Sequence, residues 1–150
     1  ITKNADGGGV KAIAAKDGIN AIKINSGRML LAYGFLRKVF EIFELYKTPI
    51  DMITTSEVAV SVTIDDATQL KNIQQELEKY GAVEVDTDQT IICVVGDFIK
   101  NEKGIAADIL DKLRTIPIRM ISYGGSNHNI SFLINTSDKE KALKSLNQLF

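Results

Sequence analysis

The sequence predicts an α+β fold made of two copies of one β-α-β-β-α-β unit. Two segments about 70 residues apart repeat the same order of features, which indicates a duplicated small domain. In each segment, short apolar strands alternate with helices whose apolar residues recur every three or four positions. Such a unit is ferredoxin-like: its strands form an antiparallel sheet, and both helices pack on one face of that sheet.

The first unit is predicted from a clear succession of elements. We expect a strand at 19–25, a helix from Gly34 to just before Pro49, strands at 49–55 and 58–65, a helix starting after 65–66, and a strand at 82–87. The second helix carries Leu70, Ile73 and Leu77 at three- and four-residue spacing, so it has one apolar face. Pro49 marks the end of the first helix because proline cannot continue a helix.

The second unit repeats this order but lacks its last strand. We expect a strand at 90–96, a helix from Gly104 to just before Pro117, strands at 117–123 and 129–135, and a helix starting after 137–138. The spare segment GVKAIAAK at 9–16 can supply the missing strand, which would insert the first unit into the second. The expected organisation is a linker at 1–8, one domain at 17–88, and a second domain formed by 9–16 and 89–150.

Composition excludes several classes of protein. The 150 residues are 45% hydrophobic and 25% charged with a net charge of −1, so nothing directs the chain to nucleic acid or a membrane surface. One cysteine, Cys93, rules out an internal disulfide, and one histidine, His128, without clustered Cys or carboxylates predicts no metal site. No apolar run reaches the roughly 18 residues of a membrane span, so we expect a cytoplasmic protein. The first residue, Ile1, suggests a fragment or a processed chain.

A polar cluster between two strands predicts a pocket for a free amino acid. The helix start at Gly34 offers unpaired N–H groups to the ligand's carboxylate, and Asp51 can accept its ammonium group. Met29, Phe35, Leu36 and Ile50 would form apolar walls, while the Thr55-Ser56-Glu57 turn would reach the far end of the ligand or the ligand of a partner subunit. The alternative is structural, since such polar residues also favour ordinary turns.

Three motifs that follow one another in the chain together resemble one family: RMLLAYGFLRKVFEIF, IDMITTSEVAVSVTID and IRMISYGGSNHNISFLI. From about residue 10 to 150 the chain resembles the paired ACT domains at the C-terminus of aspartate kinases, most closely the lysine-sensitive type. The resemblance implies a regulatory region that binds lysine, or less favourably threonine, and feedback-inhibits phosphorylation of aspartate in lysine, threonine and methionine biosynthesis. It also implies a homodimer through the ACT domains, with Asn129 and Ile130 as secondary effector or interface residues. ATP and Mg would belong to a kinase domain of the same full-length chain, and this chain itself would use no cofactor and would not catalyse.

Other functions remain open. An ACT pair could serve only as a dimerisation scaffold with an empty pocket. An RNA-binding module shares the strand order but needs exposed aromatic residues on its central strands, where this chain has VAVSVTI and TIICVVG. A small phosphatase would need a constellation of Arg, Asn or His, to which Arg119 and Asn129 come nearest.

Overall fold

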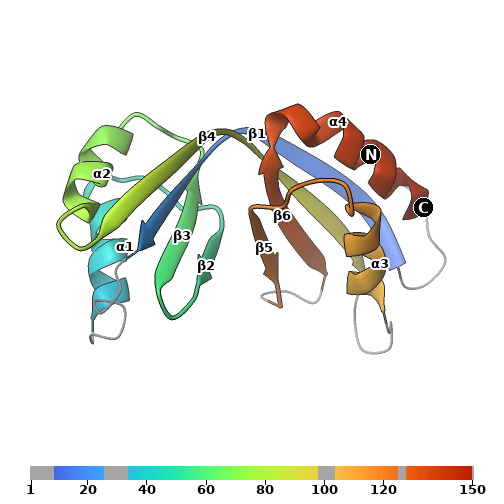
Figure 1. The fold of residues 1–150 in the computed structure, drawn as a ribbon, viewed down its shortest axis with the longest axis horizontal. Coiled ribbons are helices and arrows are strands. Elements are labelled where there is room, and N and C mark those ends of the chain that lie inside the picture. Colours follow the sequence, from blue (N-terminus) through green and yellow to red (C-terminus); the bar gives the residue numbers. More distant parts are fainter. Residues whose placement is uncertain (1–8, 26–33, 98–103, 125–127, 150) are drawn as a thin grey trace. The chain divides into compact units, whose positions relative to one another are not determined.

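The protein consists of two compact α+β units, one inserted into the other. A computed structural model describes residues 9–25, 34–97, 104–124 and 128–149 (Figure 1). Gly18–Asp88 forms the inserted unit, and Ile1–Asp17 together with Gln89–Phe150 forms the outer unit. The inserted unit agrees within one residue with the domain predicted at 17–88. The linker expected at 1–8 lies outside the described residues.

Six strands follow one another in the hydrogen-bonded order β2-β3-β1-β4-β6-β5. Their bounds are β1 (Gly9–Asn25), β2 (Ile53–Thr55), β3 (Ala59–Ile64), β4 (Ala82–Asp97), β5 (Met120–Tyr123) and β6 (Asn129–Asn135). β3 pairs antiparallel with both β1 and β2, and β6 pairs antiparallel with both β4 and β5. β2 and β5 therefore stand at the two ends of the strand order, each with one neighbour.

Two long strands replace four of the expected short ones. Segments 9–16 and 19–25 are parts of β1, and segments 82–87 and 90–96 are parts of β4. Each long strand contains a left-handed residue at the border between the units, Gly18 with φ 73° and Asp88 with φ 55°. Glycine adopts this conformation at little cost and aspartate tolerates it better than most residues, so each strand continues through it.

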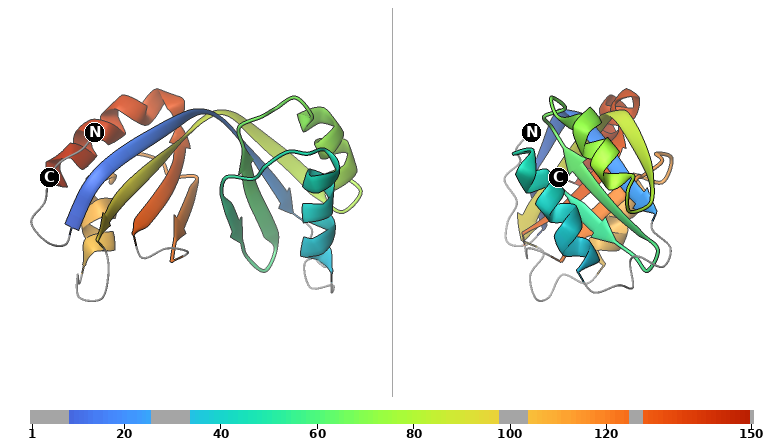
Figure 2. Two further views of the ribbon diagram at one scale, coloured as in Figure 1. Left: turned by 180° about the vertical axis from the view of Figure 1, so that it is seen from behind. Right: turned by 90° about the vertical axis from the view of Figure 1, so that its left-hand side faces the viewer.

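Each unit has two helices on one face of its strands (Figures 1 and 2). The inserted unit contains α1 (Phe35–Leu45) and α2 (Leu70–Leu77), and the outer unit contains α3 (Ile105–Lys112) and α4 (Lys139–Leu146), the latter flanked by 3₁₀ turns at Thr136–Asp138 and Asn147–Leu149. α1 ends before the expected limit at Pro49. Lys47 turns into the left-handed region at φ 49°, and the Thr48 N–H donates to the Phe43 carbonyl at 2.9 Å.

Each unit has its own hydrophobic core between helices and strands. Alternate residues of β3, namely Val60, Val62 and Ile64, are buried against Val39 and Phe43 of α1 and their neighbours in the inserted unit. In the outer unit, alternate residues of β6 do the same: Ile130, Phe132 and Ile134 pack with Ile109 of α3 and Leu146 of α4. The two repeats thus use the same strand positions for their cores.

Candidate functional site

The start of α1 is shaped to accept an anion. Gly34, at the N-cap, has φ 86° and ψ 2°, a conformation that favours glycine. Its carbonyl accepts the first helical hydrogen bond from the Lys38 N–H at 3.0 Å, and it makes no side-chain cap. The first turn carries no acidic residue, so its N–H groups and the helix dipole favour negative charge. Phe35 points into the core at 2% exposure, whereas Leu36 is 41% exposed.

The predicted Thr55-Ser56-Glu57 segment forms the turn between β2 and β3. The Ser56 N–H donates to the Ala59 carbonyl at 2.9 Å, and the Val58 N–H donates to the Ser56 hydroxyl oxygen at 3.4 Å. Ser56 therefore stabilises the turn, as the structural alternative expects. All three predicted side chains are exposed, and Glu57 places a carboxylate at the tip of the hairpin.

Asp51 is fixed at the opposite end of the same hairpin by Thr63. The Asp51 N–H donates to the Thr63 carbonyl at 2.8 Å, and the Met52 N–H donates to the Thr63 hydroxyl at 2.8 Å. Thr63 is fully buried, so its hydroxyl has a defined partner, while the Asp51 side chain is exposed and Ile50 is half-buried against the core. Sequence reasoning missed Thr63. The sequence did contain a signal for Thr63: the first repeat has a polar residue where the second repeat has the apolar Leu133.

Within one chain, Asp51 does not lie beside the start of α1, so the two groups do not form one pocket in a single copy. Along β3, Thr63 beside Asp51 and Ala59 beside Ser56 are four residues apart, or about 13 Å. Ala59 pairs with Asn25, the last residue of β1, and α1 begins at this same hairpin end (Figures 1 and 2). Asp51 lies at the other end, beyond the last turn of α1.

The direction of the crossover explains the separation. α1 connects β1 to β2 and runs opposite to both strands, so β2 starts where α1 ends. The helix has 11 residues and spans about 16 Å. The carboxylate and the ammonium group of an amino acid are attached to the same carbon atom. They therefore cannot be held by the α1 start and by Asp51 of one chain together.

The predicted residues consequently form two half-sites in the inserted unit. We call the first the hairpin half-site; it contains Gly34, Phe35, Leu36, Thr55, Ser56 and Glu57. The second, the acid half-site, contains Ile50 and Asp51. Met29 lies outside the described residues. The secondary candidates Asn129 and Ile130 are in the outer unit, where Asn129 is half-buried and Ile130 is 1% exposed within the core.

The described part of the chain contains neither a metal-binding cluster nor a membrane-spanning helix. No three His, Cys, Asp or Glu residues gather there in a way that could hold a metal ion. None of the helices in the described ranges is both long and apolar enough to span a bilayer. Cys93 is half-buried in β4, opposite Ser131 of β6.

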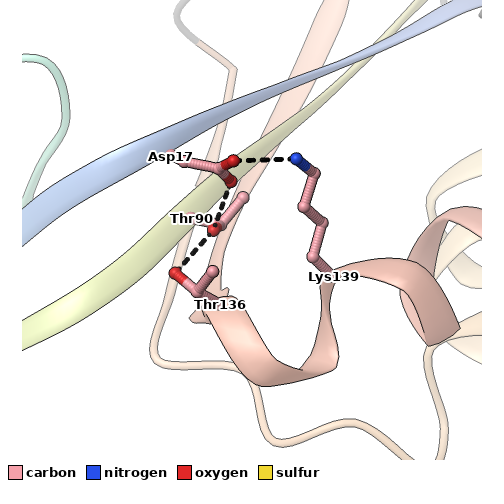
Figure 3. Close-up of polar contacts among 4 residues, drawn as sticks. All are labelled: Asp17, Thr90, Thr136 and Lys139. Atoms are coloured by element: carbon pink, nitrogen blue, oxygen red, sulfur yellow. Dashed lines mark hydrogen bonds and ion pairs between the residues drawn. The ribbon is translucent and has the colours of Figure 1, made fainter.

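A polar network that the sequence did not predict joins β1, β4 and the start of α4 in the outer unit (Figure 3). Lys139 Nζ donates to Asp17 Oδ2 at 2.8 Å, and the Thr90 hydroxyl donates to Asp17 Oδ1 at 2.9 Å. The Thr90 and Thr136 hydroxyl oxygens are 2.8 Å apart. Because Thr90 gives its one proton to Asp17, Thr136 is the donor between the two threonines. These bonds lower the pKa of Asp17, chiefly through Lys139 and then Thr90.

The network predicts a pH-dependent contribution to stability. The folded-state pKa of Asp17 lies below its ordinary value of 3.8, so the contribution is present above that value and is lost as the pH falls through the folded-state pKa. Between pH 5 and roughly pH 2, the thermal midpoint of wild type should therefore fall more than that of Asp17→Asn. Asp138→Asn, on the adjacent 3₁₀ turn, is the control and should follow wild type. Parallel curves for wild type and Asp17→Asn would contradict the prediction.

Comparison with known proteins agrees with this architecture. Residues 92–150 match the ACT domain family. The chain is 41% identical over 141 residues to an aspartokinase of Candida albicans, covering 90% of this chain and 26% of that protein. A solved structure described as a C-terminal regulatory domain of aspartate kinase from Porphyromonas gingivalis W83 is 51% identical with a TM-score of 0.84, covering 93% of this chain and 96% of that one. Escherichia coli aspartokinase III, solved with lysine and aspartate in a T-state, is 30% identical with a TM-score of 0.83, covering 98% of this chain and 35% of that one.

The two β-α-β-β-α-β units define a protein of the ACT-domain class. Within that class, the chain belongs to the C-terminal regulatory domains of aspartate kinases. It spans about a quarter of the length of the curated aspartokinase from Candida albicans.

Proposed function

We propose that this chain senses lysine for an aspartate kinase, and that lysine binds between two copies of the inserted unit. The supporting observation is the separation of the two half-sites. Each half-site alone offers a partner for only part of a zwitterion, and burying the other charge unpaired would be costly. A second copy of the chain supplies the missing half.

The position of β2 makes this pairing geometrically simple. In the described part of the chain, β2 is an edge strand that pairs only with β3. Its other edge can therefore pair with the β2 strand of a second copy. A twofold axis near Thr54 makes the two edge strands antiparallel and places Asp51 of one copy beside Glu57 of the other. Apolar side chains exposed at 36–41% near this strand, Ile53 of β2 and Leu36 and Phe40 of α1, would be covered by the contact.

The charges of the combined site favour lysine over threonine. The α1 start binds one carboxylate, while Asp51 and Glu57 offer two partners for ammonium groups. Lysine carries one carboxylate and two ammonium groups, so every charge finds a partner. Threonine carries a single ammonium group and would leave one of the two carboxylates without a cation. The lysine in the Escherichia coli relative supports the same choice.

Inhibition follows if the kinase part of the whole protein works in an arrangement that differs from the lysine-bound pair. A ligand bound by two copies stabilises only the arrangement in which both half-sites meet, and it shifts the population toward that arrangement. A coupling free energy of about 1–3 kcal/mol changes activity by roughly 5–150-fold. In this proposal, ATP and Mg serve the kinase part, and this chain uses neither.

Isothermal titration calorimetry of the 150-residue chain with lysine, threonine and methionine tests the proposal. We expect heat and a thermal shift with lysine, weaker effects with threonine and none with methionine. Sedimentation measured with and without lysine shows whether binding stabilises a dimer. A dimer that gives no heat with any of the three amino acids would identify a scaffold instead of a sensor.

A further inference from the structure

The described part of the outer unit contains structural counterparts of the α1 start and of the Asp51 position. Gly104 begins α3 with φ 81° and ψ 4°, and its carbonyl accepts from the Asp108 N–H at 2.9 Å, as Gly34 does from Lys38. The Arg119 N–H donates to the Leu133 carbonyl at 2.8 Å, which matches the bond from Asp51 to Thr63. Arg119 is therefore the positional equivalent of Asp51.

Two apolar positions are exposed in both units. Leu110 of α3 corresponds to Phe40 of α1, with exposures of 37% and 40%. Ile121 of β5 corresponds to Ile53 of β2, with exposures of 40% and 36%. At these described positions, the backbone of the outer unit resembles that of the inserted unit.

The two units carry opposite charges at two matching positions, one just before the edge strand and one in the first turn of the helix. Arg119, exposed at the start of β5, stands where the inserted unit has the acid Asp51. Asp108, exposed in the first turn of α3, stands where α1 has Lys38. A cation at the first position repels an ammonium group, and an acid in the first turn of a helix repels a carboxylate at its N-terminus.

We propose that Arg119, assisted by Asp108, excludes amino-acid effectors from the outer unit, so that each chain binds one effector molecule. This inference rests on the proposed function and adds a specificity determinant to it. The two repeats differ in ligand binding through electrostatics, while their backbones at these positions are alike. Exchanging the two charges should therefore allow the outer unit to bind an amino-acid effector.

The test counts the equivalents of L-lysine bound per chain by calorimetry and equilibrium dialysis. Wild type should bind one strong equivalent, and Asp51→Asn should bind none with comparable affinity. The double variant Asp108→Lys/Arg119→Asp gives these two positions the charges of the inserted unit. It should bind a second, weaker equivalent, because the outer turn has no acid that corresponds to Glu57. The matched control Asp108→Asn/Arg119→Gln removes both charges without exchanging them and should stay at one strong equivalent. All four proteins are first checked for folding by circular dichroism.

The outcomes separate the inference from the proposed function. Two equivalents in wild type, one of which survives Asp51→Asn, would overturn the inference and leave lysine sensing intact. A charge-exchanged variant that still binds one equivalent would overturn the role of Arg119. No lysine bound to wild type would instead remove the proposed function.

Discussion

Replacing Phe132 by alanine should lower the free energy of unfolding of the outer unit by about 3–5 kcal/mol. Phe132 is fully buried in the middle of β6, packed among Ile92, Ile109 and other core residues. Truncation removes its buried apolar surface and leaves a cavity that the surrounding side chains fill only in part. Since small proteins are typically stable by about 5–15 kcal/mol, this loss is a large part of the total.

Urea denaturation followed by circular dichroism measures the effect. Because the outer unit has a core of its own, its transition should move to lower urea ahead of that of the inserted unit. Tyr123→Ala is the control, since it removes an aromatic ring that is 50% exposed on the neighbouring strand β5. A loss for Phe132→Ala no larger than that for Tyr123→Ala would contradict the assignment of the outer core.

Replacing Asp51 by alanine should weaken lysine binding by about 10–150-fold, because a charge-assisted hydrogen bond contributes roughly 1.5–3 kcal/mol. The Asp51 side chain is exposed, and its backbone bond to Thr63 does not depend on the carboxylate. The thermal midpoint without lysine should therefore stay close to that of wild type. Calorimetry measures the affinity, and Asp51→Asn, which keeps the size but removes the charge, should lose nearly as much.

A matched variant isolates this effect from general electrostatics. Glu44 is an exposed acid on α1 outside both half-sites, so Glu44→Ala should leave the affinity for lysine within about twofold of wild type. If Asp51→Ala and Glu44→Ala reduced the affinity equally, Asp51 would contribute only through the net charge of the chain.

The repeat made most of the fold predictable. The matching PIDM and PIRM segments, each between a helix and a short strand, give the order of elements in both units. Local signals did not predict that β1 and β4 each continue through the border between the units. That continuity depends on left-handed backbone at Gly18 and Asp88, which hydrophobic periodicity does not report.

The candidate site was harder to predict because it depends on chain direction. Asp51 and Gly34 are both suited to an amino acid, and composition and motif place them in one unit. Their separation follows only when α1 is drawn as a crossover that runs opposite to β1 and β2. Tertiary contacts decide the rest. Thr63 accepts hydrogen bonds from the backbone N–H groups of Asp51 and Met52, and Asp17 accepts one from Lys139, 122 residues away in sequence.

Mixing two variants that each bind lysine poorly is the most direct test of a site shared by two chains. Asp51→Ala lacks one half-site and Glu57→Ala weakens the other, so each variant alone should bind lysine poorly. After equal amounts are unfolded and refolded together, half of the dimers should contain one chain of each kind, and each mixed dimer should have one intact site made of Asp51 from one chain and Glu57 from the other. We predict recovery of about a quarter of the high-affinity lysine sites of wild type. A mixture that binds no better than the separate variants would contradict a site built from two chains.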